Sequence, residues 1–208
     1  MSANCCNTLP DPHRGDENYR RVLWAVLAIN ASMFAVEVAT GLAASSASLQ
    51  ADALDFLGDA GNYAISLFVI GMALRYRALV ALLKGATMAV FALWVIGVTC
   101  WHAWHETVPD AITMGAVGVG ALIANALSFG LLMAYRSGDA NMRSAWICSR
   151  NDVLGNLAVL LAALGVFGTG TGWPDVIVAA IMAGLALQGA WIVVRHARQE
   201  LQVAALPA

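Results

Sequence analysis

The chain has 208 residues, of which 60% are hydrophobic and only 12% are charged. Soluble domains usually carry about 25% charged residues, so this composition predicts a chain that lies mostly in lipid. A mean hydropathy of +0.71 agrees with that prediction. The net charge of −2 and the lack of a Lys/Arg cluster exclude a nucleic-acid partner.

Residues 1–19 are polar and lack the apolar core of a secretory signal peptide, so we expect a flexible cytoplasmic tail. The cysteines (Cys5, Cys6, Cys100, Cys148) show no C-x-x-C spacing, and we expect no disulfide framework. Cys5 and Cys6, with His13, are a weak candidate for capturing cytoplasmic metal, because adjacent cysteines on a tail are often incidental.

Six apolar stretches are long enough to cross a bilayer, which takes roughly 20 residues. They are residues 20–43, 48–74, 79–102, 111–135, 143–168 and 174–195. The second and fifth carry several polar residues and are the least apolar. We therefore predict an all-α membrane protein, with six transmembrane helices in a domain over residues 20–198 and a short cytoplasmic tail at 199–208.

Basic residues alternate strictly between the connections. Those near the two termini and around the second and fourth connections are Arg14, Arg20, Arg21, Arg75, Arg77, Lys84, Arg136, Arg143, Arg195 and Arg198. The other connections, near 44–47, 103–110 and 169–173, contain no Lys or Arg. Because basic residues stay on the cytoplasmic side, both termini are predicted to be cytoplasmic. The remaining one, Arg150, lies inside the fifth span and has a structural role or pairs with a buried acid.

Acidic side chains within the predicted spans are the strongest functional signal, because charge at membrane depth is costly. They are Glu37, Asp52, Asp55, Asp59 and Asp152. The three aspartates of the second span share one helical face, where they repel one another unless protons or a metal ion lie among them. At about 1.5 Å per residue, Asp55, Asp59 and Asp152 fall near the middle of the bilayer.

Two pairs on different spans each present donors one helical turn apart, Asp55 with Asp59 and Cys148 with Asp152. Facing each other, they would offer the four ligands of a zinc-like tetrahedral site. A thiolate would extend the preference towards cadmium, but inert packing of Cys148 is an equal alternative. Both helices also contain a D-x-L-G pattern, whose glycines favour close helix packing.

Several other polar residues are secondary candidates. Asp52 is a further ligand, a helix cap or part of the entrance, and Glu37 relays protons or pairs with Arg150. Asn156 lies close to the predicted site, whereas the other intramembrane asparagines are expected to form interhelical hydrogen bonds: Asn30, Asn62 and Asn125.

A histidine pair closes the third span, where His102, His105 and Glu106 could bind a metal ion outside the membrane core. Trp101 and Trp104 beside them favour an aromatic belt at the interface instead. The glycine-rich segment that ends at Asp175 lacks the lysine of a nucleotide-binding loop, so we expect transport to be driven by gradients.

The runs SLQADALDFLGDAGNYAISL and CSRNDVLGNLAVLLAALGVFGTGTGWPD resemble the second and fifth helices of the cation diffusion facilitator family. Further similar positions are Asn30, Glu37, Asn125 and Gly172 to Asp175. The resemblance implies export of divalent metal, zinc or cadmium foremost, through ligands that fall by position on Asp55, Asp59, Cys148 and Asp152. It also implies a homodimer in a bacterial inner membrane, with the metal as substrate and no cofactor.

The sequence departs from that family in two respects. Cys148 stands where members usually have His or Asp, which affects ion selectivity. The chain also resembles the minority of members without a cytoplasmic metal-binding domain after the last helix.

We therefore expect a metal/proton antiporter rather than an enzyme, in which the second and fifth helices rock as a unit. One alternative is an intramembrane aspartyl protease, although Phe56-Leu57-Gly58-Asp59 lacks the first glycine of its G-x-G-D signature. The other is a non-transporting scaffold or metal-sensing membrane subunit.

Overall fold

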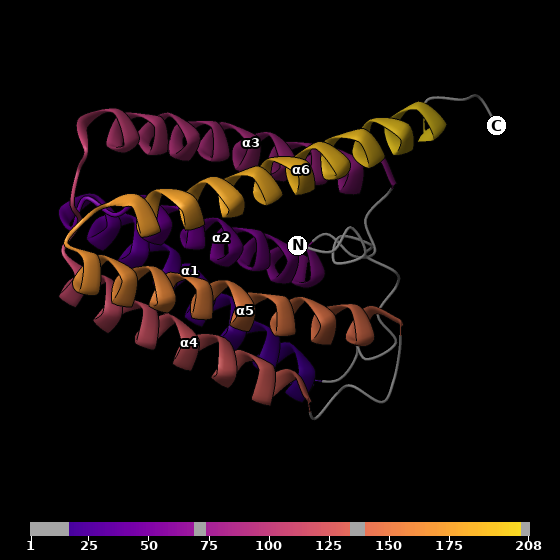
Figure 1. Cartoon of the computed structure of the whole chain (residues 1–208). Coiled ribbons are helices and arrows are strands. Elements are labelled where there is room, and N and C mark those ends of the chain that lie inside the picture. The colour runs from indigo at the N-terminus through magenta and orange to yellow at the C-terminus, as the bar shows by residue number, and fades with distance from the viewer. Residues whose placement is uncertain (1–16, 69–73, 134–139, 205–208) are drawn as a thin grey trace.

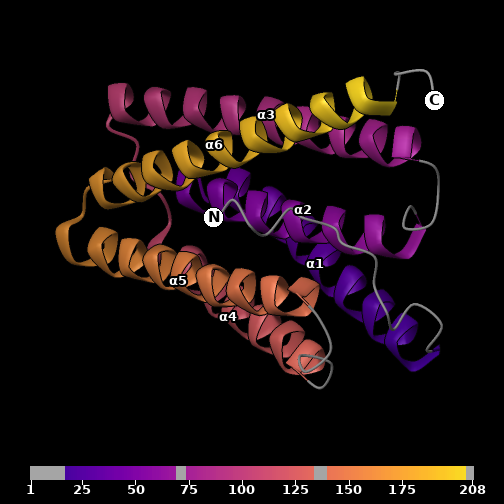
Figure 2. The same ribbon diagram turned by 90° about the vertical axis from the view of Figure 1, so that its right-hand side faces the viewer.

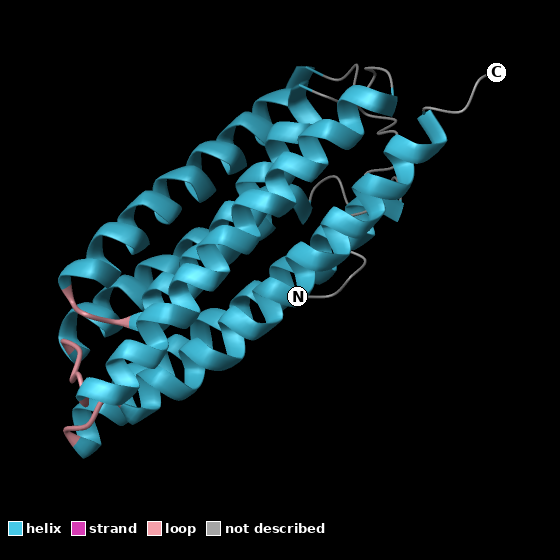
Figure 3. Ribbon diagram, turned by 90° about the horizontal axis from the view of Figure 1, so that it is seen from above, coloured by secondary structure: helices cyan, strands magenta, loops and turns pink. Residues whose placement is uncertain are grey.

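The computed structural model describes residues 17–68, 74–133 and 140–204, except for the side chains of 74, 140–151, 203 and 204. This part of the chain forms six helices and contains no strand (Figure 3). The helices are α1 (Glu17–Ala43), α2 (Ala47–Phe68), α3 (Leu74–His105), α4 (Ala111–Met133), α5 (Ala140–Thr169) and α6 (Trp173–Ala204). The prediction of an all-α chain with six helices is confirmed.

The six helices form three layers. The α3 and α6 helices pack together on one side, α4 and α5 pair on the other, and α1 and α2 lie between them (Figures 1 and 2). The α2 helix contacts α1, α3, α5 and α6. The helix that carries three aspartates is therefore enclosed by four others.

Five of the helices in the described part are long and apolar enough to cross a membrane. The exception is α2, because Asp52, Asp55 and Asp59 lie within its length. Most boundaries match the predicted spans within a few residues. The α6 helix extends to Ala204, beyond the predicted domain limit at residue 198.

Small residues dominate the interior. Alanines of α2, α3, α5 and α6 are buried together, among them Ala47, Ala92, Ala163 and Ala183. Many large apolar side chains lie on the outside; Ile112 and Phe167 are each 75% exposed. This distribution suits a membrane, where small residues let helices approach closely and lipid contacts the large apolar side chains.

The α1–α2, α3–α4 and α5–α6 turns meet at one end of the bundle, opposite the start of α1 and the end of α6 (Figure 1). The amide of Asp110 donates to the carbonyl oxygen of Ala44, which joins the first two turns (3.0 Å). A Cβ atom at Gly172 would lie 1.9 Å from the carbonyl oxygen of Thr107, so the third turn packs directly on the second. We call this the turn end.

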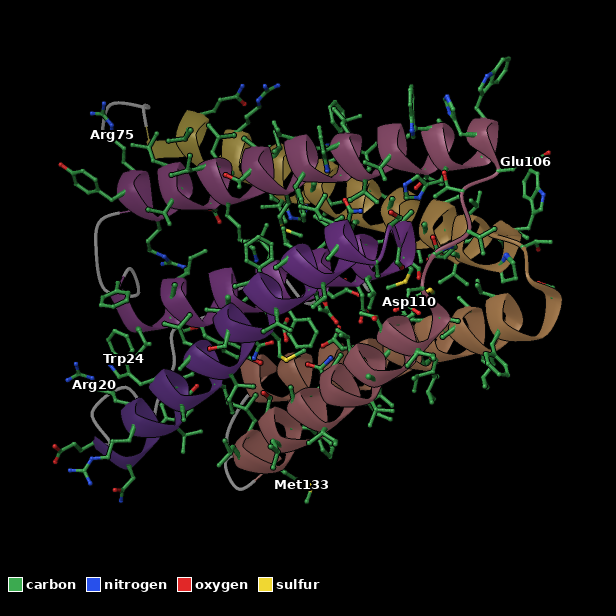
Figure 4. All side chains as sticks on the ribbon, turned by 90° about the vertical axis from the view of Figure 1, so that its left-hand side faces the viewer. Arg20, Trp24, Arg75, Glu106, Asp110 and Met133 are labelled. Atoms are coloured by element: carbon green, nitrogen blue, oxygen red, sulfur yellow. The ribbon has the colours of Figure 1, made fainter. Side chains whose placement is uncertain are left out.

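Charge is divided between the two ends. Arg20 and Arg75 lie at the end of the termini, and Glu106 and Asp110 lie at the turn end (Figure 4). The cytoplasmic placement of the termini remains a prediction. Lys84, which was predicted to lie around the turn before the third span, lies well inside α3 and is half-buried.

The start of α2 is capped by another helix. The Asp175 carboxylate of α6 accepts hydrogen bonds from the backbone amides of Ala47 (2.8 Å) and Ser48 (3.0 Å). It also accepts from the hydroxyl groups of Ser46 (2.7 Å) and Ser48 (2.6 Å). Asp175, rather than Asp52, therefore caps α2 and fixes where the aspartate-bearing helix begins.

Candidate metal site

The aspartates of α2 face α5 at a glycine. A Cβ atom on Gly155 would lie 3.4 Å from Oδ2 of Asp55 and 3.6 Å from Oδ1 of Asp52. The missing side chain thus allows two carboxyl groups to lie against the α5 backbone. Of the two D-x-L-G segments, the one in α5 therefore has its glycine, Gly155, in contact with aspartates of α2, as predicted.

The acids are arranged in pairs between helices. The carboxyl groups of Glu37 and Asp52 are close enough to interact, as are those of Asp59 and Asp152. Two neighbouring carboxyl groups can form a hydrogen bond only when one of them holds a proton and donates it. The hydroxyl of Tyr63 also donates weakly to Oδ2 of Asp59, at 3.4 Å.

This region is buried and rich in oxygen atoms without donors. Glu37 and Asn156 are fully buried, Asp52 is 1% exposed and Asp152 is 8% exposed. Among the described residues, no donor reaches either oxygen of Glu37, Oδ2 of Asp52 or Oδ1 of Asn156. Buried acceptors without partners are costly, so this cluster of oxygens favours occupation by cations, either protons or a metal.

The structure brings most of the predicted site residues together. Asp55, Asp59 and Asp152 meet at the α2–α5 contact, and Asp52 and Glu37 extend the cluster towards α1. Among the described side chains, no three His, Cys, Asp or Glu residues are close enough to hold a metal ion as they stand. The complete tetrahedral set therefore remains a prediction.

Some predicted residues lie outside the described parts. Cys148 and Arg150 belong to α5, but their side chains fall in the excluded range. Neither Cys148 as a ligand nor the pairing of Glu37 with Arg150 is tested. Cys5, Cys6 and His13 precede the described residues altogether.

Two predicted interhelical asparagines do join helices. The side-chain amide of Asn30 in α1 donates to Ser128 Oγ of α4 at 3.3 Å, as well as to Val26 of its own helix. Lys84 of α3 donates to the amide oxygen of Asn62 in α2. Lys84 also interacts electrostatically with Asp59, so a cation lies beside the cluster.

Sequence reasoning missed both this role of Lys84 and the capping role of Asp175. Lys84 is the only lysine in the chain and lies within an apolar stretch, which was an available signal. Asp175 follows Trp173 and Pro174 as an ordinary first-turn acid would. Nothing local indicates that it caps a helix that begins 128 residues earlier.

The two histidines at the turn end point in different directions. His105 stacks on Trp101 with ring centroids 3.8 Å apart, and its Nδ1 lies 3.0 Å from the Trp101 carbonyl oxygen. Trp101 and Trp104 are 62% and 85% exposed. His105 thus lies with the tryptophans on the outer face, as expected for an aromatic belt, whereas His102 is 9% exposed and faces inward.

Comparison with known proteins adds an independent line of evidence. A family model described as the cation efflux transmembrane domain matches residues 23–202. The zinc transporter ZitB of Escherichia coli is 30% identical over 199 residues, which cover 89% of this chain and 63% of the relative. The chain thus spans less than two thirds of that relative's length.

Two further relatives extend the range of metals. The metal cation efflux system protein CzcD of Cupriavidus metallidurans is 25% identical over 187 residues, covering 84% of this chain and 59% of CzcD. A cadmium, cobalt and zinc/H(+)-K(+) antiporter of Bacillus velezensis is 24% identical over 202 residues, covering 88% of this chain and 63% of the antiporter. All three names describe proteins that transport metal cations.

Proposed function

Because the chain belongs to the cation efflux family, as an integral multi-pass membrane protein, we propose that it exports divalent metal cations, zinc or cadmium foremost, from the cytoplasm. The observation that carries this proposal is the buried group of acids at the contact of α1, α2 and α5. A buried cluster rich in carboxyl oxygens and poor in donors has affinity for cations and little value as a structural core. Metal transport by the named relatives supports the same function.

The proposed transport site consists of Asp55 and Asp59 of α2 with Cys148 and Asp152 of α5. Three carboxylates and one thiolate make four donors of the kinds that zinc and cadmium accept. Asp52, Glu37 and Asn156 would adjust the charge and hydrogen bonding around this set.

The proposed mechanism is metal/proton antiport. Metal binding requires ligands without protons, so an entering cation releases the protons shared in the carboxyl pairs. This exchange keeps the buried charge low in both states, because either protons or the metal neutralise the acids. On the far side, protons re-enter the cluster and displace the metal.

Family membership argues against the alternative of an intramembrane aspartyl protease, since the family consists of cation transporters. The non-transporting metal-sensing subunit is distinguished by flux through the purified chain alone. The homodimer and the bacterial inner membrane belong to the proposal, and cross-linking in native membranes tests the former.

The direct test is zinc and cadmium uptake into proteoliposomes under an imposed pH gradient. We expect Asp59→Ala to abolish flux of both ions and Cys148→Ala to reduce cadmium flux more than zinc flux. Asp110→Ala is the matched control, because this acid is exposed and lies at the turn end. Unchanged flux in Asp59→Ala would remove the acid cluster from the transport path.

A further inference from the structure

A second cavity lies at the turn end of the bundle, separate from the acid cluster. It has a volume of about 260 Å³ and is enclosed by the end of α3 and by the α5–α6 turn. Its polar lining includes His102, Glu106, Thr107 and Thr171, and Trp173 also contributes to its wall. We call it the turn-end pocket.

His102 is the first of two unusual features of this pocket. Its side chain is more than nine-tenths buried, yet among the described residues no partner reaches its Nδ1 atom. A buried ring nitrogen normally finds a hydrogen-bond partner. His102 lines the cavity, and an imidazole nitrogen without a partner is a preferred ligand atom for zinc-like cations.

Glu106 is the second unusual feature. It has a φ of 49° at the end of α3, and the amide of Thr107 donates back to the carbonyl oxygen of His102 at 3.1 Å. This is a Schellman motif, in which the left-handed residue is usually glycine. A glutamate costs conformational energy in this position, where a glycine would not.

The charge around the pocket favours a cation. Glu106 and Asp110 lie at this end of the molecule, and residues 44–47, 103–110 and 169–173 contain no Lys or Arg. Asp175 is near enough to His102 to interact with it electrostatically. Among the residues that line the pocket, His102 of α3 offers an imidazole and Glu106, directly after the end of α3, offers a carboxylate.

We propose that the turn-end pocket is a second divalent-cation site, in which His102 and Glu106 are the protein ligands and water molecules complete the coordination. With two protein ligands the site is exchangeable rather than structural, since structural zinc sites use four. It lies at the end away from the termini, so it would hold ions on the side to which the transport site discharges them. Binding of a metal ion to this pocket does not depend on transport, so zinc binding tests the proposal directly.

The test is equilibrium dialysis of the detergent-purified full chain against zinc, with the number of bound ions counted per chain. We expect His102→Gln to weaken one class of site about tenfold or more, because it removes one of only two protein ligands. His105→Gln is the matched control, since this ring is stacked on Trp101 outside the pocket. Equal binding by the two variants would overturn the proposal.

A second variant separates metal binding from folding. Glu106→Gly relieves the left-handed strain and should raise the Tm by about 2–4 °C while weakening zinc binding at the same site. A gain in Tm without a loss of zinc binding would show that Glu106 is not a ligand. If His102→Gln loses an ion while Asp59→Ala transports normally, the pocket site stands and the proposed transport site fails. If His102→Gln binds zinc as the wild type does while Asp59→Ala loses transport, the pocket site fails and the proposed transport site stands.

Discussion

The inter-helix cap of α2 makes a quantitative prediction about stability. Asp175 is 1% exposed, and its carboxylate accepts the backbone amides of Ala47 and Ser48. In Asp175→Ala both amides lose their buried acceptor, at about 1–3 kcal/mol each, so we expect a loss of about 4 kcal/mol. The Ser46 and Ser48 hydroxyl groups lie 3.4 Å apart and can pair with each other, so they add little.

For a chain of this size, that loss corresponds to a Tm lowered by about 8–16 °C. Asp175→Asn should have a smaller effect, because one oxygen remains to accept the three bonds that Oδ1 receives, and only the Ala47 amide loses its acceptor. The assay is thermal unfolding of the purified protein in detergent, followed by circular dichroism. The chain offers a matched control in Asp110→Ala, because Asp110 accepts the Ile112 amide at the start of α4 but is exposed.

The expected order of Tm is wild type and Asp110→Ala highest, then Asp175→Asn, then Asp175→Ala. If Asp175→Ala and Asp110→Ala unfolded at the same Tm, the argument that burial makes this cap strong would be refuted. Asp175→Asn melting as low as Asp175→Ala would show that the negative charge, rather than the acceptor geometry, stabilises the helix start.

Three further changes test the packing and the acid cluster. Gly172→Ala should lower the Tm markedly in the same melting assay, because its Cβ would lie 1.9 Å from a carbonyl oxygen. The control is Gly168→Ala, whose Cβ would have no atom within 4 Å, so its Tm should be unchanged or slightly higher. Gly155→Ala places a Cβ in ordinary contact with Asp55 (3.4 Å) and should retain most zinc flux. The larger side chain of Gly155→Val should lower zinc flux about tenfold or more. Equal zinc flux in the two variants would contradict the close α2–α5 contact. Glu37→Gln should fold normally, since its amide can donate where a proton is now shared, and should release about one proton fewer per zinc ion, counted with a pH dye in weak buffer; unchanged release would remove Glu37 from the exchange.

The helices could be predicted from the sequence because lipid imposes a strong constraint on length and hydropathy. The first span was predicted to end at residue 43, and α1 ends at Ala43. The second span was less certain, because its three aspartates leave α2 as the exception among the described helices, of which the other five are apolar enough to cross a membrane. Only its length and flanks indicated that it crosses the membrane.

Side-chain direction was much harder to predict. His102 and His105 lie three positions apart, and from the sequence alone we considered them as one possible metal-binding motif. In the structure His102 faces a pocket and His105 stacks on a tryptophan. Likewise, hydropathy placed Lys84 near a turn, although its partner Asn62 lies on another helix. Such choices depend on which neighbouring helix covers each face, and one chain's periodicity does not contain that information.

The polar contacts bear on how the site could open. Asp175 of α6 binds the first residues of α2, and Lys84 of α3 binds Asn62 near its other end. On the opposite side, Asn30 joins α1 to α4 through Ser128. The fixed hydrogen bonds therefore divide the bundle into α2 with α3 and α6, and α1 with α4, to which α5 is packed.

The acid cluster lies at the boundary between these two groups, because Glu37 belongs to α1, Asp52 to α2 and Asp152 to α5. A movement of one group against the other would open the carboxyl pairs and break none of these three hydrogen-bonded links. Rocking of α2 and α5 as one unit, the motion expected from the sequence, would instead require the Asp175 and Lys84 bonds to break. For the proposed transport mechanism, these links favour separation of α2 from α5, with the two groups sliding along the contact of α1 and α2.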